Sequence, residues 1–316
     1  MKAGQILTQT QKIQMNSNEK RKYLSNYKRL TKSLIIQFRP KIKAALQSQI
    51  RQFTSVYKDH PHVTPQIITS KNLKKSLINL HVTGAIKNGK LVKRELVKEI
   101  RKSARENDVW AYAIRMYLEK HGLDKVTFQI TDTLKKQITK VLLQADAEGW
   151  GIDKTVRFLD DAPFLTYMTE RIVRTELAKA TNTGAMVAAA SSKILLNKQW
   201  LSADDNRTRR IPRNDYDHLH MNGVQVGFND KFVVPSLKIV EALDFPGDPT
   251  ASAGNVCNCR CTVVFVPIRD KNGKVVRVDT ENPKIGNDKN VFYQLLQDAL
   301  MIGAGSLLST ILNTDK

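Results

Sequence analysis

The hydrophobic pattern of the chain changes once, near residue 191, and this change most constrains the fold. Before it, apolar residues recur every three or four positions over long stretches, the period of an amphipathic helix. After it, apolar segments are short, β-branched and separated by Asp, Asn, Gly and Pro, which is typical of strands. The order predicts an α+β fold, with a mostly helical N-terminal half followed by a compact domain of helices packed on a small, mainly antiparallel sheet.

The first helical stretch is also the most basic part of the chain. Residues 1–60 hold thirteen Lys or Arg and two acids, a net charge of +11 out of +21 for all 316 residues. Apolar residues recur there every fourth position, at Leu30, Leu34, Phe38, Ile42 and Leu46. The spacing predicts a long amphipathic helix, which Pro40 should kink or split.

Four further helical segments are predicted between residues 60 and 191. The pattern stays helical over 70–121, with a helix end at Gly122, although the Asn88-Gly89 pair favours a short hairpin within 82–92. A helix beginning near Thr131 should end at Gly149.

The next helix should take Asp153 as its N-cap, and another should span about 162–191. Strands are then expected at 198–202, 224–228, 232–235, 261–268 and 275–280.

The large positive charge predicts a polyanionic partner, because surface charge adds little to stability but attracts phosphates over long distances. DNA, RNA or an anionic membrane fit, and binding to phosphates should be sequence-independent and sensitive to salt. An ordinary solvated helix face is the alternative interpretation. The candidate DNA-binding residues are Lys20, Arg21, Lys22, Lys28, Arg29, Lys32, Arg39, Lys41 and Lys43.

Neither end of the sequence predicts export or a membrane span. The N-terminal residues lack an apolar segment of signal-peptide length, and three clustered cysteines do not resemble a secreted disulfide framework. We therefore expect folding in a reducing, intracellular place. The apolar segment 299–312 is too short to cross a bilayer and is expected to be a buried or partner-docking helix.

All three cysteines alternate immediately before an apolar run that predicts a strand. Residues two apart in an extended chain project to one face, so Cys259 and Cys261 can approach a single ion. His218, with His220 or Cys257 as a fourth ligand, would complete a tetrahedral zinc site. The alternative is that the thiols are reduced and pack as small apolar groups, because the spacing differs from that of a zinc knuckle. A disulfide between residues two apart would be strained.

Five short motifs follow one another in the second half of the chain. They are RIVRTELAKATNTG (171–184), WLSADDNRTR (200–209), HLHMNG (218–223), FPGDP (245–249) and NCRC (258–261). Their succession resembles the phage Mu protein F-like family of minor head, or head-morphogenesis, proteins of tailed bacteriophages, over about 131–267. The motif residues are Arg174, Glu176, Trp200, Asp205, Arg207, Arg209, Gly223 and Arg260.

The sequence departs from the family pattern at two places. The segment 210–217 separates the RTR element from the histidines, so the choice of His218 over His220 rests on the spacing to Asn222-Gly223. Cys257 lies outside the NCRC motif.

The resemblance implies a non-enzymatic virion protein, present in few copies in the interior of the phage head and made in the host cytoplasm. It would act in procapsid assembly, and in genome delivery, with the portal protein, the scaffold or major capsid protein and non-specifically bound double-stranded DNA as partners. We expect a basic helical region that contacts DNA or the portal (1–125), the Mu F-like minor head domain (126–270) and a C-terminal hairpin with an apolar helix (271–316).

Two other functions remain open at this stage. Asp205, Arg209 and His218 combine a carboxylate, a cation and an imidazole, which is the set that a toxin-like nuclease or transferase would need. The simpler interpretation is that Asp204 or Asp205 and the arginines form a hydrogen-bonded loop that closes onto NCRC, with Trp200 packed beneath. A cellular nucleic-acid-binding protein is the third alternative.

Overall fold

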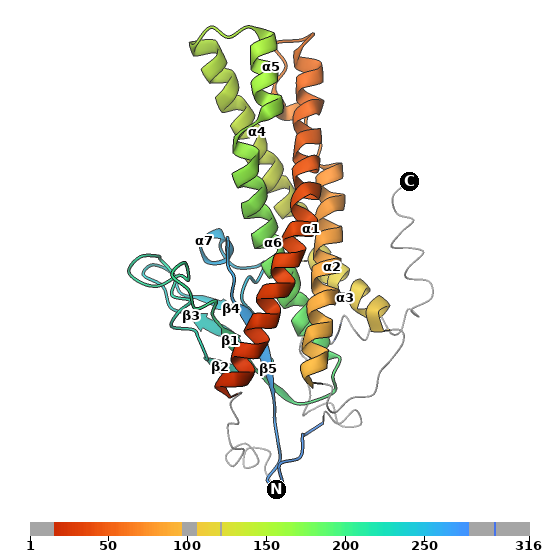
Figure 1. The fold of residues 1–316 in the computed structure, drawn as a ribbon, viewed down its shortest axis with the longest axis vertical. Helices are drawn as coiled ribbons and strands as arrows, with labels where there is room; N and C mark the ends of the chain where they lie inside the picture. Colours follow the sequence, from red (N-terminus) through yellow and green to blue (C-terminus); the bar gives the residue numbers. More distant parts are fainter. Residues whose placement is uncertain (1–15, 97–105, 121, 278–293, 295–316) are drawn as a thin grey trace.

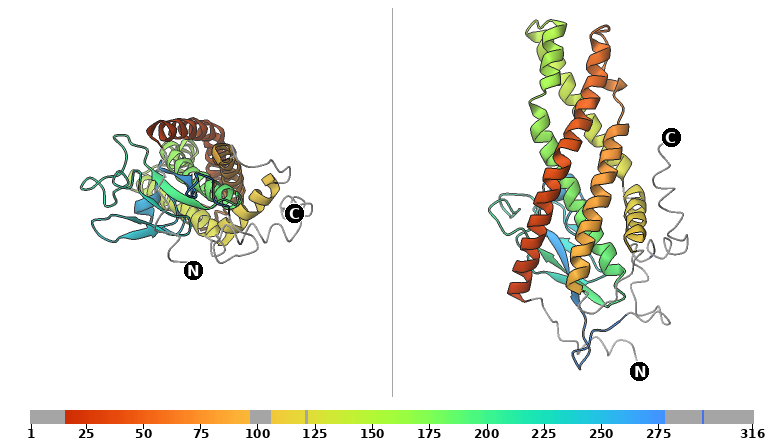
Figure 2. Two further views of the ribbon diagram at one scale, coloured as in Figure 1. Left: turned by 90° about the horizontal axis from the view of Figure 1, so that it is seen from below. Right: turned by 45° about the vertical axis from the view of Figure 1, so that its right-hand side comes forward.

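Long helices stand side by side in an elongated bundle, and the strands pack against one end of it (Figures 1 and 2). The structure is a computed structural model that describes residues 16–96, 106–120, 122–277 and residue 294. The elements in chain order are α1 (Ser17–Tyr57), the 3-10 helix η2 (Pro65–Ile67), α2 (Lys71–Leu96), α3 (Glu106–Lys120), α4 (Leu123–Ala147), α5 (Ile152–Asp161), α6 (Phe164–Ala190), β1 (Leu196–Leu201), β2 (Gln225–Gly227), β3 (Phe232–Val234), β4 (Glu241–Leu243), α7 (Ala253–Val256) and β5 (Thr262–Pro267). The predicted α+β class is confirmed.

Helix α1 begins with a capping box. The Asn16 side chain accepts a hydrogen bond from the Glu19 backbone N–H at 2.9 Å, and the Glu19 carboxylate accepts one from the Asn16 N–H at 3.0 Å. The predicted apolar stripe is buried from Leu34 to Leu46, and Leu30 is half-buried. The expected split at Pro40 is wrong, because the helix runs without interruption for 41 residues. Pro40 has no N–H to donate to the Ile36 carbonyl, but both residues lie on the exposed face, where water can donate to that carbonyl instead.

The predicted hairpin within 82–92 is also wrong, because α2 is one continuous helix. The Asn-Gly pair serves the packing of α2 on α6 instead. Asn88 donates a side-chain hydrogen bond to the Thr181 carbonyl at 2.8 Å. A Cβ atom on Gly184 of α6 would lie 2.0 Å from the Ala85 carbonyl oxygen, so only glycine allows this approach.

Glycines mark the ends of the next helices. Gly122 and Gly149 have φ of 111° and 64°, in the left-handed region that the predicted helix ends require. The N-cap of α5 is Gly151 rather than the predicted Asp153, which lies in the first turn of that helix. A carboxylate there still complements the positive end of the helix dipole.

The strands form two small antiparallel sheets. One has the order β2-β1-β5, with Trp200 opposite Val263, and the other pairs β3 with β4. The last predicted strand is not formed over its described residues. They contribute only single bridges, from Val275 and Arg277, and 278–280 lie outside the described residues.

One hydrophobic core runs from α1 to β5 through α2 and α6. The proposed division between 125 and 126 falls inside α4, which starts at Leu123. No helix among the described residues is long and apolar enough to span a bilayer. The predicted apolar helix at 299–312 lies outside the described residues.

A buried charge cluster joins α2 to α6. The Glu176 carboxylate bonds His81 Nε2 at 2.9 Å and accepts a hydrogen bond from Lys179 Nζ at 2.8 Å, and all three side chains are buried. Burial alone would raise the pKa of Glu176, but the charge of Lys179 and the contact with His81 outweigh it and lower this pKa to about 2. Glu176 is therefore a charged structural group inside the helical interface.

We expect Glu176→Gln to lower the free energy of unfolding by about 3 kcal/mol at pH 7, because it leaves Lys179 buried without its carboxylate. The folded pKa lies below the ordinary value of 4.5. The contribution of the carboxylate is therefore complete above that pH and is lost as the pH falls toward 2. Urea unfolding at pH 7 and pH 3 measures the difference in the free energy of unfolding between variant and parent, and this difference should be smaller at pH 3.

Glu119→Gln is the matched control. Its carboxylate forms an exposed pair with Arg115 on α3, so its loss should change stability by at most about 0.5 kcal/mol. A Glu176→Gln difference that is equally small, or that does not depend on pH, would contradict the structural role of this cluster.

Candidate functional site

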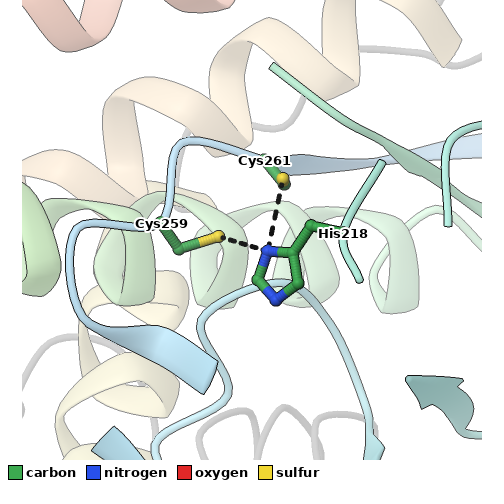
Figure 3. A group of neighbouring side chains, drawn as sticks. All are labelled: His218, Cys259 and Cys261. Carbon is green, nitrogen blue, oxygen red and sulfur yellow. Dashed lines mark hydrogen bonds between the residues drawn. The ribbon is translucent and has the colours of Figure 1, made fainter. Parts of the chain in front are cut away.

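His218 lies against the two cysteines of the NCRC motif (Figure 3). Its Nδ1 atom is 3.6 Å from Cys259 Sγ and 3.7 Å from Cys261 Sγ. The three ligand atoms lie within 4.8 Å of one another, and each residue is at most 3% exposed. The fold thus brings together three residues that the sequence singled out, although about 40 positions separate the histidine from the cysteines.

A hydrogen-bonded chain behind the ring fixes its orientation. Asn255 donates from Nδ2 to the Glu241 carboxylate at 3.0 Å, so its Oδ1 atom faces His218 Nε2, at 2.6 Å. An amide oxygen can only accept, so Nε2 carries a proton, and Nδ1 is the ring nitrogen that faces the sulfurs. Trp200 packs edge-on against the ring at 5.3 Å between centroids. Asn255 and Glu241 were not predicted from the sequence, because neither stands at a recognisable ligand spacing.

The two thiols differ in acidity. The hydrogen bond with Cys261 lowers the pKa of Cys259 well below its ordinary value, in spite of burial, and the contact with His218 lowers it further. The same thiol–thiol hydrogen bond, together with burial, raises the pKa of Cys261. Cys259 is therefore the more acidic thiol of the pair.

The two candidates for a fourth ligand stand outside this cluster. Among the described residues, the group of ligand atoms contains neither Cys257 nor His220. The half-buried Cys257 offers its backbone carbonyl to the Arg209 guanidinium. His220 is exposed and donates its backbone N–H to Asp217 at 2.8 Å.

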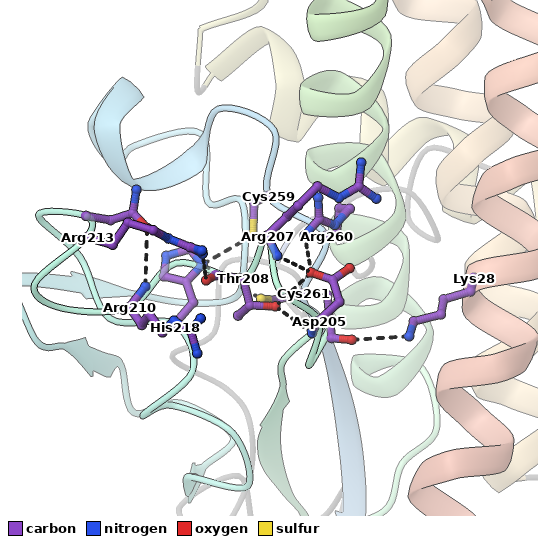
Figure 4. Close-up of polar contacts among 12 residues, drawn as sticks. Lys28, Asp205, Arg207, Thr208, Arg210, Arg213, His218, Cys259, Arg260 and Cys261 are labelled. Atoms are coloured by element: carbon purple, nitrogen blue, oxygen red, sulfur yellow. Dashed lines mark hydrogen bonds and ion pairs between the residues drawn. The ribbon is translucent and has the colours of Figure 1, made fainter.

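The loop before the histidines closes onto the NCRC motif (Figure 4). Asp205 forms an ion pair with Arg260 at 2.6 Å and accepts hydrogen bonds from the Arg207 backbone N–H and the Thr208 hydroxyl. Burial raises the pKa of Asp205, but Arg260 and these donors outweigh it, so the pKa is lowered. Trp200 lies buried against His218, as the interpretation of a closed loop predicts.

A cleft of about 560 Å³ separates this loop from α1. Its walls hold six cations and one carboxylate, that of Asp205. The cations are Lys28, Lys32 and Arg39 from α1, Arg174 from α6, and Arg207 and Arg260 from the loop and the motif. Figure 4 shows Lys28 reaching across from α1, where its Nζ atom donates to the Ala203 carbonyl at 3.1 Å. Glu170 pairs with both Arg39 and Arg174 at the same place.

The cleft involves only some of the candidate DNA-binding residues. All nine lie on α1, but Lys28, Lys32 and Arg39 alone line the cleft. Arg29 lines a second, smaller hollow, and Lys41 lies over the Phe38 ring at 5.2 Å. The three cations that face α1 from the other wall were predicted as family motif residues, without an indication that they would meet this helix.

The remaining motif residues have structural contacts. Gly223 has a φ of 86° and donates its N–H to the Trp200 carbonyl at 2.8 Å.

The proposed catalytic set is engaged with separate partners. Asp205 is bound to Arg260, Arg209 to the Cys257 carbonyl, and His218 to Asn255 and the thiols.

Comparison with known proteins finds one family match in this part of the chain. Residues 136–264 match the family described as Phage Mu protein F like protein. No curated protein and no solved structure matches the chain. The matched range begins inside α4, ends in β5 and contains the loop, His218 and the NCRC motif. Residues 136–264 therefore match the family that the motifs predict, and this family suggests a phage head morphogenesis protein.

Proposed function

We propose that the protein is a minor head protein of a tailed bacteriophage, which acts in procapsid assembly at the portal and contacts the packaged DNA inside the head. The family match supports the role in head morphogenesis. The observation that carries the contact with DNA is the cationic cleft, because it joins the basic helix α1 to the family segment itself. A polyanion bound there would touch both parts of the chain.

The charges of the cleft favour an anionic occupant. Its six cations exceed the lining carboxylate and the nearby Glu170 by four positive charges. Within the part of the chain that the structure describes, neither Lys32 nor Arg207 forms an ion pair. Cations crowded without counter-charges repel one another, and phosphate groups would relieve this repulsion.

The cations of α1 also continue beyond the cleft. Arg21, Lys28, Lys32 and Arg39 are spaced by seven, four and seven residues, which places them on one side of the helix. All four are exposed. Such a row can follow a phosphate backbone without reading base sequence, as expected for DNA that is packaged regardless of its sequence.

The observations favour this function over an enzyme. A toxin-like mechanism would require Asp205, Arg209 and His218 to meet at one substrate. Each of the three is instead held by a different partner, and His218 is buried beneath the loop. We therefore assign these side chains to the stability of the loop and the motif.

The head-assembly role predicts that the chain is found inside assembled phage particles. Heads purified from producing cells should contain it at few copies per portal, and added protease should degrade it only after the heads are opened. Quantitative mass spectrometry of intact and opened heads measures both properties. A chain that is absent from heads and purifies with host nucleic acid would support a cellular nucleic-acid-binding protein instead.

The cleft predicts which cations bind DNA. Lys32→Gln and Arg207→Gln should each weaken binding of the full-length protein to duplex DNA. Each should also reduce the slope of log Kd against the logarithm of the salt concentration by about one, the contribution of one phosphate contact. Fluorescence anisotropy over a range of salt concentrations measures this slope for several unrelated DNA sequences.

Arg51→Gln is the matched control, because this exposed cation also lies on α1 but outside the cleft. It should leave the slope unchanged. Equal losses of DNA affinity in all three variants would mean that only the overall charge attracts DNA. Binding that does not depend on salt would contradict the electrostatic account.

A further inference from the structure

We propose that His218, Cys259 and Cys261 bind one Zn²⁺ ion, with a water molecule from the cationic cleft as the fourth ligand. This inference does not depend on the proposed function, because it follows from the geometry and chemistry of three buried side chains. It takes up one of the two interpretations of the cysteines that the sequence leaves open, a metal site rather than packed thiols.

The distances fit a tetrahedral zinc ion. With Zn–S of about 2.3 Å and Zn–N of about 2.0–2.1 Å, two ligands of such an ion lie about 3.6 Å apart when one is nitrogen and the other sulfur. The two measured distances from Nδ1 are 3.6 and 3.7 Å. The three ligand atoms are thus close enough together to hold a single ion (Figure 3).

Packed thiols explain this arrangement less well. A neutral imidazole with its proton on Nε2 offers a single lone pair, which accepts one good hydrogen bond. Here two sulfurs approach the same nitrogen at nearly equal distance. An ion between the three atoms gives each of them its own bond.

The contacts of the histidine are those of a metal ligand. Histidines that bind metals commonly donate their other ring N–H to an oxygen, which fixes the tautomer and the orientation of the ring. Asn255 provides this oxygen, and Glu241 holds Asn255 in place from the far side. The Glu241 carboxylate is itself fixed by the Tyr216 hydroxyl at 2.8 Å and the Ser252 backbone N–H at 3.2 Å.

The charge balance suits a buried site. Two thiolates and a neutral imidazole compensate the two positive charges of zinc, so the occupied centre is neutral and its burial costs little. Thiolate and imidazole ligands together are typical of zinc. Carboxylates, which magnesium and calcium prefer, are absent from this group of described residues.

One of the three proposed ligands borders the cleft. Cys259 lines the cleft wall beside Arg260, whereas His218 and Cys261 do not. Neither Cys257 nor His220 joins the ligand group among the described residues. A zinc ion with three protein ligands keeps one position for water, and the cleft supplies that water.

Elemental analysis of the full-length protein, purified without chelators, should give about one zinc per chain. Cys259→Ser and His218→Ala should each abolish this stoichiometric zinc. Asn255→Ala, which removes the oxygen behind the ring but no ligand, should weaken zinc binding about 10- to 100-fold. Competition with a chromophoric chelator measures this change.

Cys257→Ser is the matched control, because it removes a thiol from the same segment but no proposed ligand, and it should keep the zinc. Loss of zinc in this variant would contradict the proposed ligand set. Cobalt titration of the metal-free parent protein needs no substitution, so its result does not depend on whether the ligand variants fold. The readout is the characteristic absorption that thiolate ligation gives to Co²⁺. Parent protein that contains no zinc and shows no such absorption with one equivalent of Co²⁺ would overturn the proposal.

Discussion

The buried amide of Asn182, in the middle of α6, joins the helical bundle to the sheet and the NCRC motif. Its Nδ2 atom donates to the carbonyls of Pro246 and Cys261 at 2.7 and 3.2 Å. Its Oδ1 atom accepts from the Thr262 hydroxyl at 3.0 Å and the Val263 backbone N–H at 3.1 Å. All its donors and both lone pairs are thus satisfied, and its loss would leave buried backbone groups without partners.

This contact explains why the functional features occur together. One side of α6 packs closely on α2 through glycine and the buried Glu176 cluster, while Asn182 holds the start of β5. The start of β5 follows directly on the two cysteines, so the same helix positions the proposed zinc ligands. It also contributes Arg174 to the cleft, opposite the cations of α1. The cleft therefore depends on how both halves of the chain dock on one helix.

The sequence was sufficient for α1 and α4, whose buried face repeats with a regular period, although α4 begins at Leu123 rather than near Thr131. It was also sufficient for α6 and β5, which are buried over most of their length. It misled at Asn88-Gly89, where contact with Gly184 of another helix decides the conformation. The short elements β4 and α7 carry no period, and they hold Glu241 and Asn255, which orient the histidine. The cations of α1 were evident, but their partners across the cleft become neighbours only in the folded chain, so no local pattern indicates the cleft.

We expect α6 to make the helical bundle and the Mu F-like segment one cooperative unit. Hydrogen exchange of the full-length protein, followed by mass spectrometry, compares the parent with the Asn182→Ala variant. We predict that peptides from α2 and from β5 lose protection together in the variant, because the whole unit is destabilised. Lost protection in β5 and 246–261 alone, with α2 and α6 unchanged, would show two separable units and contradict this account.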